Sequence, residues 1–205
     1  MKISKKNVKN LFIGIGLDAM GVAIITKSDL GISAVSSVAY ALSNVLPVFT
    51  FGIWSYLYQF TLFVIMCVLV KKCDWEYLSS FLIGIVFGYA LDLCRFLIHP
   101  LPETLLLRII YFVGGTGLLI LGVAFLIISE LPIMPQDLFP RELAKYFNIP
   151  YRYVKTTFDV VSVIVSFALG IIVKHQIIGL GIGTVISALI VGKSVDRVKK
   201  KLLKI

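Results

Sequence analysis

The feature that most constrains this chain is a series of long apolar stretches. Several of them reach the roughly 20 residues that an α-helix needs to cross a hydrocarbon core about 30 Å thick. Only 15% of the 205 residues are charged and 59% are hydrophobic, whereas a soluble domain carries about 25% charge. The sequence therefore predicts an all-α membrane protein with six transmembrane helices, at about residues 9–26, 51–70, 77–98, 106–128, 155–173 and 176–192.

Lysine and arginine are distributed unevenly between the predicted loops. If the N-terminus is cytoplasmic, 16 of the 20 basic residues lie on the cytoplasmic side and 4 lie outside, namely Lys27, Arg95, Arg108 and Lys174. Cytoplasmic loops of membrane proteins carry such an excess, so we expect a multi-pass protein with both termini in the cytoplasm. The net charge of +9 does not indicate a nucleic-acid surface, because the basic residues lie between and after the apolar stretches.

The sequence contains an internal repeat. Segment 14–23, GIGLDAMGVA, matches 115–124, GTGLLILGVA, at six of ten positions without a gap. Each copy holds three predicted spans, an odd number, so the second copy begins on the opposite side of the membrane. We expect one membrane domain, residues 1–205, made of two inverted three-helix repeats at about 9–98 and 106–198. Inverted repeats are frequent in transporters, which hold their site near the bilayer midplane. The alternative is that the match reflects only the glycine content of membrane helices.

The first long connection, residues 27–50, contains a short helical pattern at 31–46 without a charged residue. This short helix either re-enters the membrane from outside or lies amphipathically on its surface. A re-entrant helix presents free N–H groups near Ser33, which form a polar terminus suited to an anion. Ser33, Ser36 and Ser37 are therefore candidate residues of a substrate or ion site.

The second long connection, residues 129–154, contains a similar pattern at 132–147 that is more charged. The charges favour an interfacial position, with only the segment 132–137 reaching inward. Asp137 is expected to cap the short helix or to contact a ligand.

Four of the charged residues within the predicted spans are candidate residues of a substrate or ion site. Asp18 is near the middle of the first span, where a carboxylate exposed to lipid costs a few kcal/mol, so we expect it to face the helix bundle or a polar cavity. It is interpreted as a substrate, cation or proton site, the alternative being a structural hydrogen bond. Asp92 and Arg95 either pair on one helix face or line an outer vestibule. Asp159 is a further candidate, although the helix dipole and Lys155 offer a structural explanation.

The sequence lacks the enzyme motifs HExxH, GxSxG and GxxxxGK[ST]. The three cysteines, Cys67, Cys73 and Cys94, follow no CxxC spacing and are interpreted as packing residues. We therefore expect no catalytic residue, no metal site and no cofactor.

Four motifs together carry a family resemblance. They are Gly14-x-Gly16 followed by Gly21-Val-Ala, the pair at 30–31, the segment Pro135-x-Asp137, and GIGTVISALIVG at 181–192. Through them nearly the whole chain resembles the YczE/YyaS/YitT family of small bacterial membrane proteins. The resemblance implies a place in the bacterial cytoplasmic membrane and names no substrate.

From these features we expect a small transporter or channel-like permease that moves a small polar solute, with Asp18 as its central polar residue. The alternative is a substrate-binding or accessory subunit of a larger membrane complex. The expected partners are the lipid bilayer and the solute, together with a second copy of the chain or another membrane subunit. No nucleic acid is expected.

Overall fold

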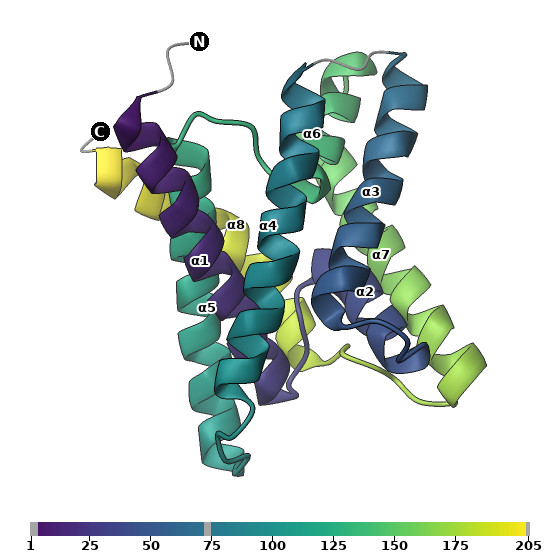
Figure 1. The fold of residues 1–205 in the computed structure, drawn as a ribbon. Coiled ribbons are helices and arrows are strands. Elements are labelled where there is room, and N and C mark those ends of the chain that lie inside the picture. Colours follow the sequence, from purple (N-terminus) through teal and green to yellow (C-terminus); the bar gives the residue numbers. More distant parts are fainter. Residues whose placement is uncertain (1–3, 72–74, 204–205) are drawn as a thin grey trace. The chain divides into compact units, whose positions relative to one another are not determined.

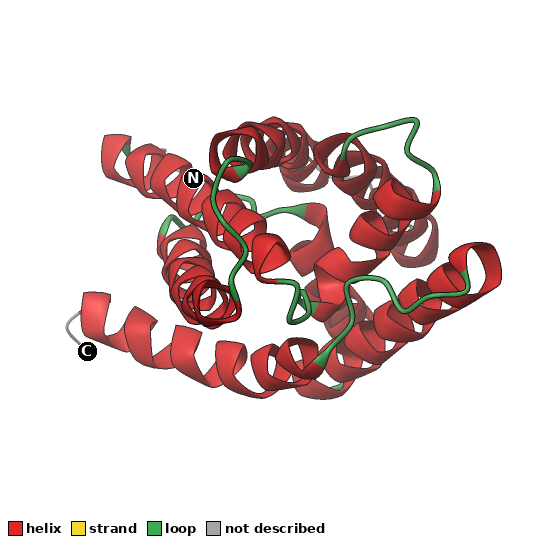
Figure 2. Ribbon diagram, turned by 90° about the horizontal axis from the view of Figure 1, so that it is seen from below, coloured by secondary structure: helices red, strands yellow, loops and turns green. Residues whose placement is uncertain are grey.

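The computed structural model describes residues 4–71 and 75–203, and all regular structure in this part of the chain is helical (Figure 2). The all-α class is therefore confirmed, while Cys73 lies outside the described residues. The helices are α1 (Lys5–Ser28), α2 (Ala34–Val45), α3 (Phe51–Val70), α4 (Trp75–Ile98), α5 (Leu105–Ile128), α6 (Pro135–Tyr146), α7 (Tyr151–Lys174) and α8 (Ile182–Leu203).

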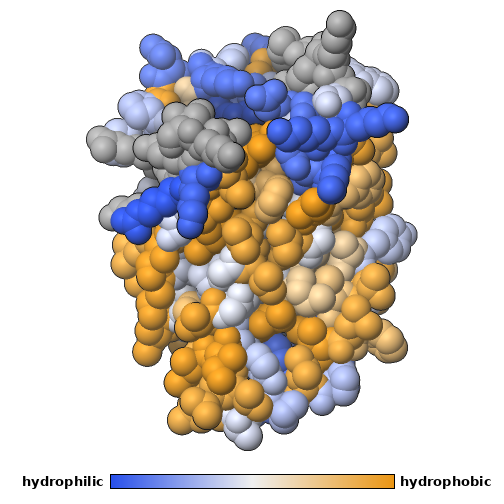
Figure 3. Space-filling model, turned by 90° about the vertical axis from the view of Figure 1, so that its left-hand side faces the viewer, coloured by the Kyte–Doolittle hydropathy of each residue, from blue (hydrophilic) through white to orange (hydrophobic). Residues whose placement is uncertain are grey.

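Five of the described helices, α1, α3, α4, α5 and α7, are long and apolar enough to cross a membrane. They contain the first five spans expected from the sequence. Large apolar side chains are exposed along them, and Figure 3 shows hydrophobic residues (orange) over much of one face of the molecule. Exposed apolar surface of this extent is suited to lipid rather than to water. The helices are thus those of a multi-pass membrane protein.

The sixth expected span, 176–192, differs from the structure. Residues 176–181 are not helical, and α8 begins only at Ile182. Backbone hydrogen bonds to another segment hold this stretch, because Ile32 N–H donates to the Gly179 carbonyl and Gly183 N–H donates to the Leu30 carbonyl, both at 2.8 Å. The uncharged helical part that remains, residues 182–192, covers about 17 Å. This is why α8 is not among the five apolar helices.

Contacts within the chain divide it into two compact units, each drawn from both halves of the sequence. Unit 1 holds residues 1–33, 89–131 and 179–205, and unit 2 holds residues 34–88 and 132–178. Each unit is described by itself.

In unit 1, α1 and α5 pack lengthwise in opposite directions (Figure 1). Glycines make the contact close: a Cβ placed on Gly21 would lie 2.5 Å from the Leu119 nitrogen, and one on Gly122 would lie 2.5 Å from the Asp18 nitrogen. Small residues at such positions let the backbones of membrane helices approach each other. The first span and the fourth therefore run antiparallel.

In unit 1, α8 also packs against α5. It begins beside Leu30 at the C-terminal end of α1, and further along Val195 packs on Ile120 and Ala124 of α5. The C-terminal end of α8 consequently lies at the same end of unit 1 as the N-terminal end of α1 (Figure 1).

In unit 2, each short helix contacts two long helices. The helix α2 packs against α7 and α3, and α6 packs against α3 and α7. Met66 of α3, Tyr77 of α4 and Leu138 of α6 form a buried apolar cluster. The two short helices thereby bring polar side chains of the long connections against the faces of α3 and α7.

Positions related by the sequence repeat, 101 residues apart, have the same local geometry. The hydroxyls of Ser28 and Ser129 each donate to the carbonyl three residues earlier at 2.6 Å. Asp29 and Glu130, the next residues, adopt left-handed φ angles of 55° and 54°. The short helices α2 and α6 begin at equivalent positions and both have 12 residues. Residues that are equivalent in the sequence repeat therefore also have equivalent local backbone structure.

Candidate functional site

Asp18 is buried in unit 1, where only 4% of its surface is exposed. Its backbone lies directly against Gly122 of α5, so the Asp18 Cβ is placed at the contact between the two helices. The side chain of this residue therefore belongs to the interior of unit 1.

Three further predicted residues also lie in the segments of unit 1. Asp92 and Arg95 are half-buried on the C-terminal part of α4. Ser33 is half-buried just before α2 begins.

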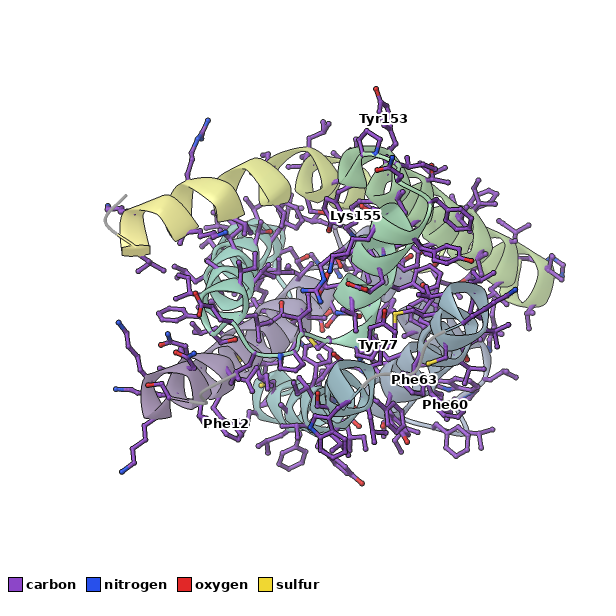
Figure 4. All side chains as sticks on the ribbon, turned by 90° about the horizontal axis from the view of Figure 1, so that it is seen from above. Phe12, Phe60, Phe63, Tyr77, Tyr153 and Lys155 are labelled. Atoms are coloured by element: carbon purple, nitrogen blue, oxygen red, sulfur yellow. The ribbon has the colours of Figure 1, made fainter. Side chains whose placement is uncertain are left out.

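The main polar group of unit 2 follows one face of α7. Lys155, Asp159, Ser162 and Ser166 are spaced by four, three and four residues, which places them on one side of a helix. We call these four residues the α7 polar row. The Lys155 Nζ lies 2.6 Å from the Asp159 Oδ1, and both side chains are about one quarter exposed. Figure 4 shows Lys155 on the inner side of α7, whereas Tyr153 points away from the helices.

The two serines of the row connect α7 to its neighbours. The Ser166 hydroxyl donates to the carbonyl oxygen of Ser37 in α2 at 3.1 Å. The Ser162 hydroxyl lies 3.3 Å from the hydroxyl of Tyr58 in α3. Ser37, Ser162 and Ser166 are all buried. Because these contacts lie along the long axis of α7, the polar surface continues from the ion pair into the apolar part of the span.

Ser36 and Ser37, the other two serines expected to form a site, lie on α2 and are both buried. The Ser37 hydroxyl donates to the Ala34 carbonyl at 2.7 Å and also lies 3.5 Å from the Ser162 carbonyl oxygen. The structure thus brings Ser37 to the α7 polar row.

Asp137 lies in the first turn of α6, but it is not the residue that caps the helix. Met134 is the N-cap, and no side chain caps the helix end. Pro135 takes the first helical position, which proline favours. The expected capping role of Asp137 is therefore wrong. Burial raises the pKa of the Asp137 carboxyl above its usual value, the Lys155 ammonium opposes this effect, and the Asp159 carboxylate adds to it. The carboxyl groups of Asp137 and Asp159 are therefore both influenced by the positive charge of Lys155.

Tyr151, just before the apolar part of α7, belongs to the same group. Burial, followed by the carboxylates of Asp137 and Asp159, raises the pKa of Tyr151 to about 12. The phenol therefore stays neutral and keeps its O–H group.

The opposite end of α6 carries a separate charged group. The Tyr77 hydroxyl donates to the Glu142 Oε2 at 2.8 Å, and the Lys145 Nζ lies 2.7 Å from the Glu142 Oε1. Burial acts to raise the pKa of Glu142, but the hydrogen bonds from Lys145 and Tyr77 outweigh it, and the pKa is lowered. Glu142 is therefore an ionised anchor between α6 and α4.

Sequence reasoning selected Asp159 and Asp137 but missed Ser162, Ser166 and Tyr58. The helical spacing from Lys155 to Ser166 was the available signal for the serines. Tyr58 carried no such signal, because its partner lies 104 residues away. Within residues 4–71 and 75–203, no group of three or more His, Cys, Asp or Glu side chains is placed to hold a metal ion.

Comparison with known proteins gives the family and no activity. Neither the curated proteins nor the solved structures gave a match. The model of one protein family, described as a family of unknown function (DUF6198), matches residues 5–200. This match includes the residues of both units that are discussed above. The chain therefore belongs to the DUF6198 family.

Proposed function

We propose that this chain is a small transporter or channel-like permease, not an enzyme, that moves a small polar solute across the bacterial cytoplasmic membrane. The observation that carries the proposal is the α7 polar row, which places an ion pair and two buried serines on a helix long and apolar enough to span a membrane. Ionisable groups inside a membrane are costly, and they mark substrate and ion pathways. A helix that only anchored the chain in lipid would need no such row.

In this proposal the solute contacts the α7 polar row together with Asp137 and Ser37. The ion pair of Lys155 and Asp159 supplies charged partners at one end of the row, and both residues act electrostatically on the Asp137 carboxyl. The serine hydroxyls continue the row with neutral partners that can both donate and accept hydrogen bonds. Asp18, buried in unit 1, is a second polar position for the solute or a coupling ion.

We further propose the inverted-repeat architecture of six spans, with both termini in the cytoplasm. The antiparallel packing of α1 and α5 supports it, because an odd number of spans in the first repeat reverses the second. The contacts of the short helices support it as well: exchanging α2 with α6 and α3 with α7 leaves the set of packed pairs in unit 2 unchanged. The architecture and the motifs favour a relationship to the YczE/YyaS/YitT proteins.

The helix α8 serves as the sixth span in this architecture. Its 22 residues cover about 33 Å. It runs beside α5 from the Leu30 end of unit 1 toward the N-terminal end of α1. The apolar part of α8 is short. In this architecture, packing against α5 stabilises the more polar part of the helix within the membrane.

Cysteine labelling tests the topology. In a variant without the natural cysteines, Pro102→Cys should react with a membrane-impermeant maleimide in intact cells. Asn148→Cys should react only after the cells are permeabilised. Both positions are exposed in the structure. Reaction of both from the same side would overturn the proposed architecture.

Reconstitution tests transport. The purified chain in liposomes should allow glycerol, urea, acetamide or ethylammonium to enter, as measured by light scattering after an osmotic step. Lys155→Met should abolish the entry that the wild type allows, while Ser187→Ala, a buried serine of unit 1, should keep it. Binding of a solute without entry would instead favour the accessory-subunit alternative.

A further inference from the structure

We propose that Gln59, Ser80 and Gly84 in unit 2 form a subsite that binds the hydrogen-bond-donating part of a small solute, an N–H or O–H group. Gln59 lies on α3, and Ser80 and Gly84 lie one turn apart on α4. The subsite deepens the proposed function, and only its connection to transport rests on that function.

Two buried polar atoms of this subsite have no hydrogen-bond partner among the described residues, namely the Gln59 Oε1 and the Ser80 Oγ. Both side chains are 0% exposed. Buried polar atoms in proteins almost always have a partner, and a lipid-embedded helix bundle has little water to supply one. We infer that a bound solute forms the missing hydrogen bonds with both atoms.

The orientation of the Gln59 amide decides which of its atoms faces the subsite. The Gln59 Nε2 donates to the hydroxyl of Ser55, one turn earlier on α3, at 3.4 Å. Ser55 is itself buried. This hydrogen bond holds the amide nitrogen toward Ser55, and the carbonyl oxygen lies beside Gly84 of α4.

The residues beside the Gln59 oxygen cannot serve it as strong donors. A Cβ on Gly84 would lie 2.8 Å from the Gln59 Oε1, so any side chain there would cover the oxygen. The nearest part of α6 is the ring of Pro135, whose Cδ lies 3.5 Å from the same point. Proline has no N–H group. Glycine on one side and proline on the other thus keep the acceptor available.

The chemistry of the two atoms sets the class of ligand. An amide oxygen only accepts hydrogen bonds, whereas a serine hydroxyl donates or accepts. The matching group therefore carries at least one N–H or O–H, as an ammonium, an amide or an alcohol does. An anion without a donor, such as nitrate, does not match the Gln59 oxygen.

Thermal unfolding of the purified full chain in detergent tests the subsite with three probes of small size. We expect ethylammonium or acetamide, but not nitrate, to raise the Tm of the wild type. Gln59→Leu should lose this shift while its Tm without probe stays equal or rises, because the substitution removes an unpaired buried oxygen. Gly84→Ala should lose the shift as well, because the added methyl covers the oxygen.

Two matched controls lie on the same helices. Thr61 of α3 and Ser79 of α4 already donate to Leu57 and Trp75 carbonyls. Thr61→Val and Ser79→Ala should therefore keep the shift. A probe shift that survives in Gln59→Leu, or an equal shift with nitrate, would overturn the subsite.

These results are separable from those of the transport assay. A Gln59-dependent Tm shift in a chain that moves no solute would retain the subsite and reject transport. Solute entry that Gln59→Leu leaves unchanged would reject the subsite and retain transport.

Discussion

The contact between α1 and α5 can be tested with alanine at two equivalent glycines. In Gly21→Ala the new methyl group would lie 2.5 Å from the Leu119 nitrogen, and in Gly122→Ala it would lie 2.5 Å from the Asp18 nitrogen. Ordinary contact begins at about 3.4 Å, so the two backbones must separate by about 1 Å. Overpacking of this kind costs about 1–3 kcal/mol. Alanine regains about 1 kcal/mol through its higher helix propensity.

We therefore expect each substitution to lower the free energy of unfolding by up to about 2 kcal/mol and the two losses to be similar. Gly16→Ala and Gly117→Ala provide the matched controls, because a Cβ at either position meets nothing within 4 Å. Both controls should be neutral or should stabilise the chain by about 0.5–1 kcal/mol.

Reversible unfolding in mixed detergent micelles, followed by far-UV circular dichroism, measures these differences. The reasoning fails if Gly21→Ala is as stable as Gly16→Ala. It also fails if the free energies of unfolding of Gly21→Ala and Gly122→Ala differ by more than about 1 kcal/mol. Equivalent contacts at the two glycines could not then explain both losses of stability.

Three further predictions concern the charged residues. Because burial raises the pKa of Asp137, the folded chain binds this proton more tightly than the unfolded chain, so stability falls as pH rises from the ordinary carboxyl pKa through the raised one. Asp137→Asn should remove this fall, and a Tm that keeps the same pH dependence would contradict the assignment. Lys155→Met should destabilise the chain by about 1–3 kcal/mol, less than for a fully buried pair, and the exchange Lys155→Asp with Asp159→Lys should recover part of it in the same unfolding assay. Asp18→Asn should fold and lose solute entry into liposomes, whereas full entry would reduce Asp18 to a structural residue.

The membrane class and five of the long helices could be predicted from the sequence because they depend on local properties. A run of about 20 apolar residues suits lipid whatever surrounds it, and lipid leaves the helix as the way for a single segment to satisfy its backbone. The predicted span at 51–70 coincides with α3 for this reason. The span at 176–192 was misplaced because its first residues bond to Leu30 and Ile32, a contact that no local pattern contains.

The residues of the candidate site were predicted only in part. Asp137 and Asp159 were selected because charge in an apolar context is conspicuous in a sequence. Gln59 was not selected, because one glutamine in a span is unremarkable until its oxygen is seen to have no donor. The role of Asp137 was also misjudged, because the sequence alone did not show that the helix begins at Pro135.

By itself, the sequence determined how far along each helix a residue lies, and therefore which charges are set inside an apolar span. The tertiary structure decided which way each helix face is turned and which helix meets it. Lys155, Ser162 and Ser166 share a face by helix geometry alone, but only packing places Tyr58 and Ser37 against that face. The physical reason is that hydropathy depends on each segment's own composition, whereas the rotation of a helix about its axis depends on side chains that are distant in the chain.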